Sequence, residues 1–337
     1  MSATAITEGQ VGGWGSVTLE NGIVAVTVLP AKGADIYAFV DVATGTDLLF
    51  KAPWGLQPPG SPPRAGSDGV GFLENYEGGW QELFPNTNDP CVHRGRPLPF
   101  HGEVATVGWE WSPVEGSGEA VAIRLAVDCP LSPLRLERVM QLEPGRSTLS
   151  LSETITNLGG EPEQAVWGHH CVLGAPLVAA GARLRAPCRT IVTIPEAWED
   201  TARLAPGQRS AWPHARLRTG GQVDLTAIPG PEEGSHDDVY LRDLDAGWAE
   251  VTNDRLGLGF RLDWDPAVFR WIISWQAYGG AHALPLAGSY ALGVEPWVGG
   301  GNLAQARAEG RALELPAGGS LSTALTATVL RPRAVSA

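Results

Sequence analysis

Three short segments of this chain carry the residues best suited to acid–base chemistry. Imidazole and carboxyl groups can donate and accept protons near neutral pH. Each segment sets such a group beside small residues and an aromatic ring: Phe100-His101-Gly102-Glu103, Trp167-Gly168-His169-His170 and Gly293-Val294-Glu295-Pro296-Trp297. If the fold brings the three segments together, they supply an acid and a base to one pocket.

The two adjacent histidines are expected to diverge. On a strand, His169 and His170 point to opposite faces, so only one can enter a given pocket. Glu295 follows the apolar run 290–294, and a partly desolvated carboxyl has a raised pKa that suits a general base. The structural alternatives are a loop His101 bonded to the backbone and a strand-end Glu295 that reaches water.

Other residues are candidates for holding a ligand. The chain has 13 tryptophans, and an indole offers a flat apolar face and one N–H donor, which suit a sugar ring. Most tryptophans fill cores, and adjacent acids before a strand are commonly a solvated turn. The candidates for ligand contact are Asp237, His169, Trp80, Glu82, Asn86, Trp275 and Trp297.

Strand signals dominate the elements that must position these groups. Apolar residues alternate with polar or small ones over 121–128 and 321–329, the period of a strand with one buried face. Glu143-Pro144-Gly145 predicts a hairpin turn between strands 134–142 and 147–156. Further extended segments are expected at 23–29, 223–228, 239–244, 247–252 and 256–264, a short helix at 302–309, and a long loop at 76–96.

The pattern predicts an all-β fold in which large antiparallel sheets pack face to face as a β-sandwich. No internal repeat or low-complexity linker divides the 337 residues. We therefore expect a single domain over residues 1–337, with its core at about 16–331.

Composition excludes several classes of partner. The formal net charge of −13 disfavours nucleic acid and anionic membrane, which attract clustered Lys and Arg. No apolar run reaches the roughly 18 residues of a membrane span, and the N-terminal segment lacks a signal-peptide pattern. The 4 cysteines form no CxxC pair, so reduced, mostly buried thiols in a cytoplasmic protein are expected. The oligomeric state stays open.

The same segments resemble sequence elements of the aldose 1-epimerases, the galactose mutarotase superfamily. His101-Gly102 is similar to the "LHG" element, and Gly168-His169-His170-Cys171-Val172-Leu173 to the "GxHPYF" element. Val294-Glu295-Pro296 resembles the C-terminal "EP" element. Thr156-Asn157 and Asp237 to Tyr240 are similar to the "TN" and "DHxF" elements, in the family's order, over about 24–329.

The resemblance implies a galactose mutarotase-like β-sandwich and an enzyme that interconverts the α and β anomers of a sugar. Carried over by motif, Glu295 takes the proton of the C1 hydroxyl and His170 donates to the ring oxygen. His101 orients or polarises that oxygen, and Asp237 holds hydroxyls. Neither a cofactor nor a metal is implied.

Two departures from the family bear on the substrate. Cys171-Val172-Leu173 replaces Pro-Tyr-Phe, and the Arg of the family's "GRxxNR" segment is absent near 77–86, where Glu77 precedes the paired glycines. An acid there would repel a phosphate, so an unphosphorylated sugar or sugar derivative is predicted.

Two alternatives remain open at this point. One is a carbohydrate-binding or sensor protein on the same fold without turnover. The other is a metal-dependent sugar isomerase with ligands drawn from His101, His169, His170 and Glu295.

Overall fold

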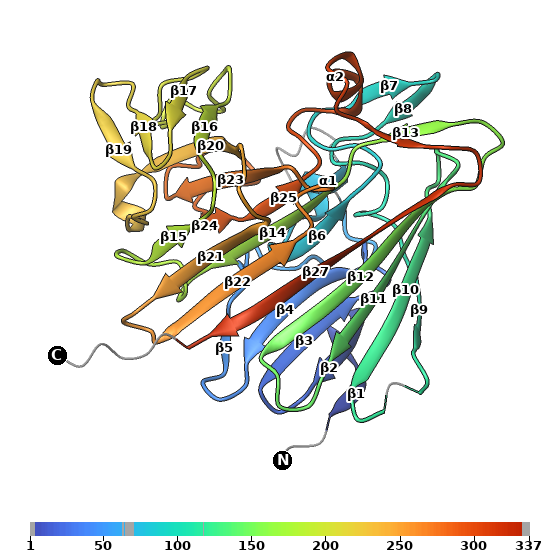
Figure 1. Cartoon of the computed structure of the whole chain (residues 1–337). Helices are drawn as coiled ribbons and strands as arrows, with labels where there is room; N and C mark the ends of the chain where they lie inside the picture. The colour runs from blue at the N-terminus through green and yellow to red at the C-terminus, as the bar shows by residue number, and fades with distance from the viewer. Residues whose placement is uncertain (1–3, 63, 65–70, 117, 332–337) are drawn as a thin grey trace.

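A computed structural model describes residues 4–62, 64, 71–116 and 118–331. The expected domain of 1–337 therefore extends at both ends into residues that lie outside the described part of the chain. Two β-sheets, packed face to face, make up most of the described residues (Figure 1). The predicted all-β sandwich is confirmed.

The larger sheet has 13 strands. Its strand order is β1 (Ala5–Val11), β2 (Trp14–Glu20), β3 (Val24–Leu29), β4 (Asp35–Asp41), β6 (Trp80–Leu83), β14 (Gly168–Gly174), β24 (Tyr290–Gly293), β23 (Trp271–Tyr278), β20 (Ser235–Arg242), β16 (Thr190–Thr193) and β17 (Arg209–Ala211). In addition, β25 (Glu295–Trp297) pairs with β14 and β23, and β5 (Thr46–Asp47) pairs with β4.

The smaller sheet has 8 strands, which run across the front of Figure 1. Their order is β15 (Arg183–Arg185), β21 (Trp248–Asn253), β22 (Leu258–Trp264), β27 (Ser320–Leu330), β12 (Thr148–Asn157), β11 (Leu134–Leu142), β10 (Val121–Asp128) and β9 (Glu110–Pro113). Neighbouring strands are antiparallel, as in β11–β12 and β12–β27.

Shorter elements cover the ends of the sandwich. The two-stranded pairs are β7 (Cys91–His93) with β8 (Arg96–Leu98), β13 (Glu163–Ala165) with β26 (Leu313–Leu315), and β18 (His214–Arg216) with β19 (Gln222–Asp224). The helices are α1 (Gly71–Asn75), α2 (Leu303–Ala308) and the 3₁₀ turn η1 (Pro231–Glu233). No helix in the described ranges is both long and apolar enough to cross a bilayer.

Alternating side chains explain why these segments pair as strands. On β12, Leu149, Leu151 and Ile155 enter the core between the sheets. On its opposite face, Thr148, Thr154 and Thr156 bond to hydroxyls of β27. This pattern gives each sheet one apolar face, and the two apolar faces form the core.

Most sequence predictions of elements are confirmed. The strand at 121–128 and the hairpin of β11 and β12 lie where the alternation placed them. The short helix begins after Asn302, whose side chain and that of Gln305 form a capping box. The expected loop at 76–96 is wrong in part because it contains β6 and β7. The segment 223–228 is a strand only to Asp224, after which the chain turns.

Candidate active site

A cavity of about 340 Å³ lies on the face of the larger sheet that is turned away from the smaller one. Its size is at the lower end of the range for small-molecule sites. Residues of α1 and of the loops around 88, 100, 198 and 284 enclose it above the strands. The lining residues are Phe72, Leu73, Tyr76, Asn88, Phe100, His101, His170, Ile194, Trp198, Glu199, His236, Asp238, Tyr240, Ile273, Trp275, Ala283, Leu284, Pro285, Leu286, Glu295 and Trp297.

Strand register assembles the floor of the cavity. Residues directly opposite each other on paired strands share one face of a sheet. Glu295 of β25 lies opposite Ile273 of β23, which lies opposite Tyr240 of β20. One step along, Trp275 lies opposite Asp238. Rows of ligand-facing groups therefore come from three strands that are distant in sequence.

His170 and Glu295 lie beside each other on this floor. His170 projects from β14, which pairs with β24 and β25, and its Nε2 lies 4.0 Å from Glu295 Oε1. That separation is too long for a hydrogen bond, but it leaves both atoms within reach of one sugar ring. Both residues are buried, at 8% and 1% exposure.

Two glycines of the sequence motifs make room for these side chains. A Cβ at Gly293 would lie 2.3 Å from Glu295 Oε1, and a Cβ at Gly168 would lie 2.6 Å from Cδ1 of the Trp297 indole. A side chain at either position would force the Glu295 carboxylate or the Trp297 ring to shift. The two glycines thus leave both groups in their places.

His101 approaches the pair from a loop. Its backbone is in the left-handed region at φ 59, and its Nδ1 accepts a hydrogen bond of 3.0 Å from the backbone N–H of Asn88. Because Nδ1 is the acceptor, Nε2 carries the proton in the neutral ring. The His101 ring centroid lies 5.5 Å from that of His170 and 5.8 Å from that of Trp297. His101 can therefore donate from Nε2 beside the pair.

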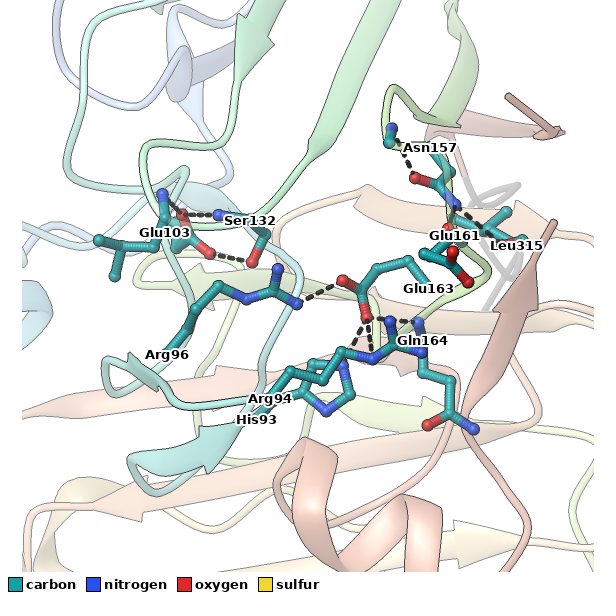
Figure 2. Close-up of polar contacts among 12 residues, drawn as sticks. His93, Arg94, Arg96, Glu103, Ser132, Asn157, Glu161, Glu163, Gln164 and Leu315 are labelled. Atoms are coloured by element: carbon teal, nitrogen blue, oxygen red, sulfur yellow. Dashed lines mark hydrogen bonds and ion pairs between the residues drawn. The ribbon is translucent and has the colours of Figure 1, made fainter. Parts of the chain in front are cut away.

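Contacts outside the cavity fix the chain on both sides of His101 (Figure 2). Before it, His93 and Arg96 of the β7–β8 hairpin both contact the Glu163 carboxylate, with His93 Nε2 at 2.5 Å. After it, Glu103 accepts from Ser132 Oγ at 2.6 Å and from the N–H of Leu131. The loop that carries His101 is thereby anchored to β13 and to the turn before β11.

Burial sets the charge of the site. Desolvation lowers the pKa of His170 to about 3 and that of His101 well below its usual value. Desolvation, and then the charge of Asp238, raise the pKa of Glu295 well above its usual value. Burial also raises the pKa of Asp238 to about 7. Burial thus favours the neutral form of both residues, a protonated Glu295 and an unprotonated His170.

Five polar atoms of the cavity lining are buried without a hydrogen-bond partner in the described part of the chain. They are Tyr76 Oη, His170 Nδ1, Asp238 Oδ1, Glu295 Oε1 and Trp297 Nε1. Leaving such groups unpaired costs about 1–3 kcal/mol each. A ligand rich in hydroxyl groups would satisfy them, while the aromatic walls would cover its apolar faces.

Five of the ten sequence-predicted site residues meet in the cavity: His101, His170, Glu295, Trp275 and Trp297. Three of the others face the core between the sheets. Glu82 lies opposite His169 and Trp80 opposite Cys171 in the β6–β14 register, so these side chains share the face away from His170. Trp80 Nε1 donates to His169 Nδ1 at 3.1 Å.

The core-facing group forms a buried charge cluster that links the sheets. Arg138 of β11 bonds to Glu82 and, at 2.8 Å, to Glu153 of β12. His169 Nε2 lies 3.1 Å from Glu153. Glu82, Glu153 and His169 are also the one set of three potential metal ligands found among the described residues. Since Arg138 already bonds both carboxylates, its guanidinium takes the place that a metal cation would have beside them.

The metal-isomerase alternative drew its ligands from His101, His169, His170 and Glu295. The divergence of the two adjacent histidines removes His169 from such a ligand set.

Asn86 and Asp237 also lie outside the cavity lining. Asn86 donates to the carbonyls of Asp89 and Pro99 and accepts from the N–H of Leu303, so it shapes the loop before His101. Asp237 Oδ1 accepts from the N–H of Leu204. Its neighbour Asp238 faces the cavity instead, because successive strand residues alternate in direction.

Several lining residues were not predicted from the sequence: His236, Tyr240, Glu199, Trp198 and the residues of α1. Period-two alternation along β20 could have identified His236, Asp238 and Tyr240 as one face. The loop residues carried no such signal.

Glu77 was expected to repel a phosphate from the site, but its side chain is buried against Lys32 at 2.5 Å. The lining contains three carboxylates, those of Glu199, Asp238 and Glu295, and neither Lys nor Arg among its described residues.

The arrangement is suited to proton exchange between two oxygens of one ligand. A neutral pair holds one proton and offers one acceptor, so it can take a proton from one hydroxyl while it gives another to a nearby oxygen. His101 Nε2–H and the Trp297 indole add donors that can stabilise developing negative charge.

Solved structures with the same fold include three sugar-epimerase-like proteins. A candidate aldose 1-epimerase from Klebsiella pneumoniae matches with a TM-score of 0.74 at 18% identity, over 98% of this chain and 85% of its own. A second candidate, from Escherichia coli K12, has a TM-score of 0.62 at 16% identity, over 97% and 100%. A galactose mutarotase-like protein from Clostridium acetobutylicum has a TM-score of 0.62 at 12% identity, over 98% and 99%.

At these identities the likeness establishes the fold, a galactose mutarotase-like β-sandwich. No curated protein matches the sequence. The family model described as a domain of unknown function (DUF4432) matches residues 12–329, nearly the whole chain. The protein belongs to the DUF4432 family.

Proposed function

We propose that this protein is an aldose 1-epimerase-like enzyme that interconverts the α and β anomers of an unphosphorylated sugar or sugar derivative. The observation that carries the proposal is the His170–Glu295 pair, 4.0 Å apart on the floor of the cavity. The names of the solved structures that share the fold support the same reaction class.

The reaction needs only proton transfers and one reversible bond cleavage. One member of the pair accepts the proton of the C1 hydroxyl while the other protonates the ring oxygen, and the bond from C1 to that oxygen breaks. The aldehyde forms, C1 rotates, and the reverse steps close the ring on its other face. Well-placed acid–base groups contribute about 10²–10⁴-fold to such steps.

The neutral state of the pair refines the roles inferred from the sequence motifs. With Glu295 protonated and His170 neutral, Glu295 is the donor and His170 the acceptor unless the proton first passes between them. Because the reaction removes one proton and returns one, either assignment conserves the proton count. Which atom meets C1 depends on the orientation of the bound sugar.

The lining favours a ligand without negative charge. Glu199, Asp238 and Glu295 line the cavity with no cationic side chain from the described residues. A phosphate or carboxylate would be desolvated there without a cationic partner, which is costly. Unphosphorylated aldoses, deoxy sugars and related neutral derivatives fit better.

NMR exchange spectroscopy, which follows the α and β anomeric signals of free sugars, tests the proposal. Across a panel of neutral aldoses and deoxy sugars, the wild type should accelerate anomer exchange for at least one member, with no added cofactor. Glu295→Gln should abolish that acceleration but keep sugar affinity within a few-fold, whereas exposed His214 changed to Asn should have no effect. Sugar binding without accelerated exchange would instead indicate the carbohydrate-binding alternative.

A further inference from the structure

Two consecutive loop residues, Trp198 and Glu199, form hydrogen bonds to two side chains on the cavity floor. The loop between β16 and β17 contributes Trp198 and Glu199 to the lining. Trp198 Nε1 donates to Asp238 Oδ2 at 2.6 Å, and a Glu199 oxygen lies 2.8 Å from His236 Nδ1. Since Asp238 and His236 are two positions apart on β20, the loop is fastened to the cavity face of that strand.

Glu199 also holds the opposite rim of the cavity. Its carboxylate accepts from the backbone N–H of His282 at 3.0 Å and from that of Ala283 at 2.5 Å, both in the segment between β23 and β24. The Glu199 side chain is 6% exposed. One buried carboxylate therefore joins both rim loops to the floor.

Trp275, His236 and Glu199 are joined in series by hydrogen bonds, and the donor of each bond follows from the atoms involved. Trp275 Nε1, which can only donate, lies 2.7 Å from His236 Nε2. His236 Nε2 must accept, so the proton of the neutral ring is on Nδ1, which donates to Glu199. The order Trp275 to His236 to Glu199 sets the orientation of the Trp275 indole, whose ring centroid lies 6.4 Å from that of His170.

We propose that Glu199 is a positioning residue for ligand binding, which clasps the two rim loops together and fixes the Trp275 wall through His236. The identity of the ligand as a sugar rests on the proposed function above. The carboxylate does not contact the His170–Glu295 pair, so the clasp acts on binding and leaves the proton transfers unaltered.

The test compares the wild type with Glu199→Ala and Glu199→Gln. Hydrogen bonds to a charged group contribute about 1.5–3 kcal/mol, and each 1.4 kcal/mol is about tenfold in affinity. We expect KM for the preferred sugar to rise at least about tenfold in both variants, with kcat within about twofold. Glu199→Gln should not restore the wild-type KM. Its amide oxygen can accept from His236 or from the rim N–H groups but not from all of them.

Hydrogen exchange provides a readout independent of turnover. The amides of His282 and Ala283 should exchange faster in both variants, while Glu196→Ala, an exposed acid in the same loop, should leave exchange and KM unchanged. Unaltered protection with unaltered KM would overturn the clasp, as would a loss confined to kcat.

The experiments distinguish a failure of the Glu199 clasp from a failure of the proposed anomer exchange. If the wild type exchanges no anomers, sugar binding followed by tryptophan fluorescence replaces KM, and the clasp still predicts weaker binding in the Glu199 variants. If the wild type binds no sugar either, both proposals are wrong.

Discussion

At the scale of single residues, desolvation matters more than any specific charge in deciding what the site can do. His170 and Glu295 have opposite ionisation behaviour, and burial moves both toward their neutral forms. A pair that is neutral over a broad pH range retains one proton to give and one site to accept. This is the property that anomer exchange requires.

The pKa of His170 gives a direct prediction. A free histidine ionises near pH 6.5, whereas burial lowers the pKa of His170 to about 3. The ring should therefore remain neutral as the pH falls through 6.5 and gain a proton only far below it. An NMR titration of the His170 ring, assigned with His170→Asn, measures this.

A His170 midpoint near that of a free histidine, about pH 6.5, would contradict the desolvated site.

Among the strands, the sequence predicts where each strand lies better than it predicts which of its side chains point to the cavity. The alternation over 121–128 and the turn at Glu143-Pro144-Gly145 depend only on residues adjacent in sequence, so both could be predicted. Whether Asp237 or Asp238 faces the ligand depends on the pairing of β20 with β23, which sequence does not display. The same holds for Trp80 and Glu82, whose face is set by their register with β14.

Some of the predicted residues line the cavity because local packing constrains the sequence around them. A Cβ at Gly168 or Gly293 would displace the Trp297 ring or the Glu295 carboxylate, so small residues beside these groups were a usable signal. The rim residues Trp198 and Glu199 come from an irregular loop whose position depends on tertiary contacts. No spacing in the sequence could have placed them.

Gly293→Ala tests the role of β24 in shaping the site. The added Cβ would lie 2.3 Å from Glu295 Oε1, so the carboxylate must move. We expect anomer exchange to fall at least about 10²-fold, the contribution of a well-placed acid–base group. Gly15→Ala, where a Cβ meets nothing within 4 Å, should keep full activity. Full activity in Gly293→Ala would show that Glu295 needs no defined position.

At the scale of the whole molecule, the sandwich is held by an apolar core with a charged cluster inside it. Arg138, Glu82, Glu153 and His169 are each at most 1% exposed and join strands of both sheets. Burial disfavours the charge of His169, yet the neighbouring carboxylates of Glu82 and Glu153 raise its pKa. The Arg138 guanidinium, which bonds to both carboxylates, supplies the positive charge of this cluster directly beneath the cavity floor.

Removing Arg138 should therefore be costly. Arg138→Met leaves two buried carboxylates without their guanidinium, and breaking a buried ion pair in this way costs about 3–5 kcal/mol. Arg135→Met on the same strand removes a partly exposed pair with Asp128, which should cost at most about 1 kcal/mol. Urea unfolding of the three proteins gives both values, and equal losses would show that the cluster adds nothing to stability.

The raised pKa of Glu295 should make the site destabilising at neutral pH. Below about pH 4.5 both folded and unfolded states carry the proton. Above it the unfolded state loses the proton while the folded state keeps it, so the free energy of unfolding falls by up to about 1.4 kcal/mol per pH unit. Glu295→Gln removes this term. Its stability relative to the wild type should rise as the pH increases above about 4.5, and a constant difference in urea unfolding would contradict the raised pKa.

If His170 and Glu295 act as one proton-exchanging unit, a double-mutant cycle on the rate of anomer exchange will show it. His170→Asn and Glu295→Gln should each lower the rate at least about 10²-fold. Together they should lower it no further than the worse single change, because residues that act as a unit are not additive. Losses that multiply in the double variant, or a single variant that retains the wild-type rate, would contradict the account.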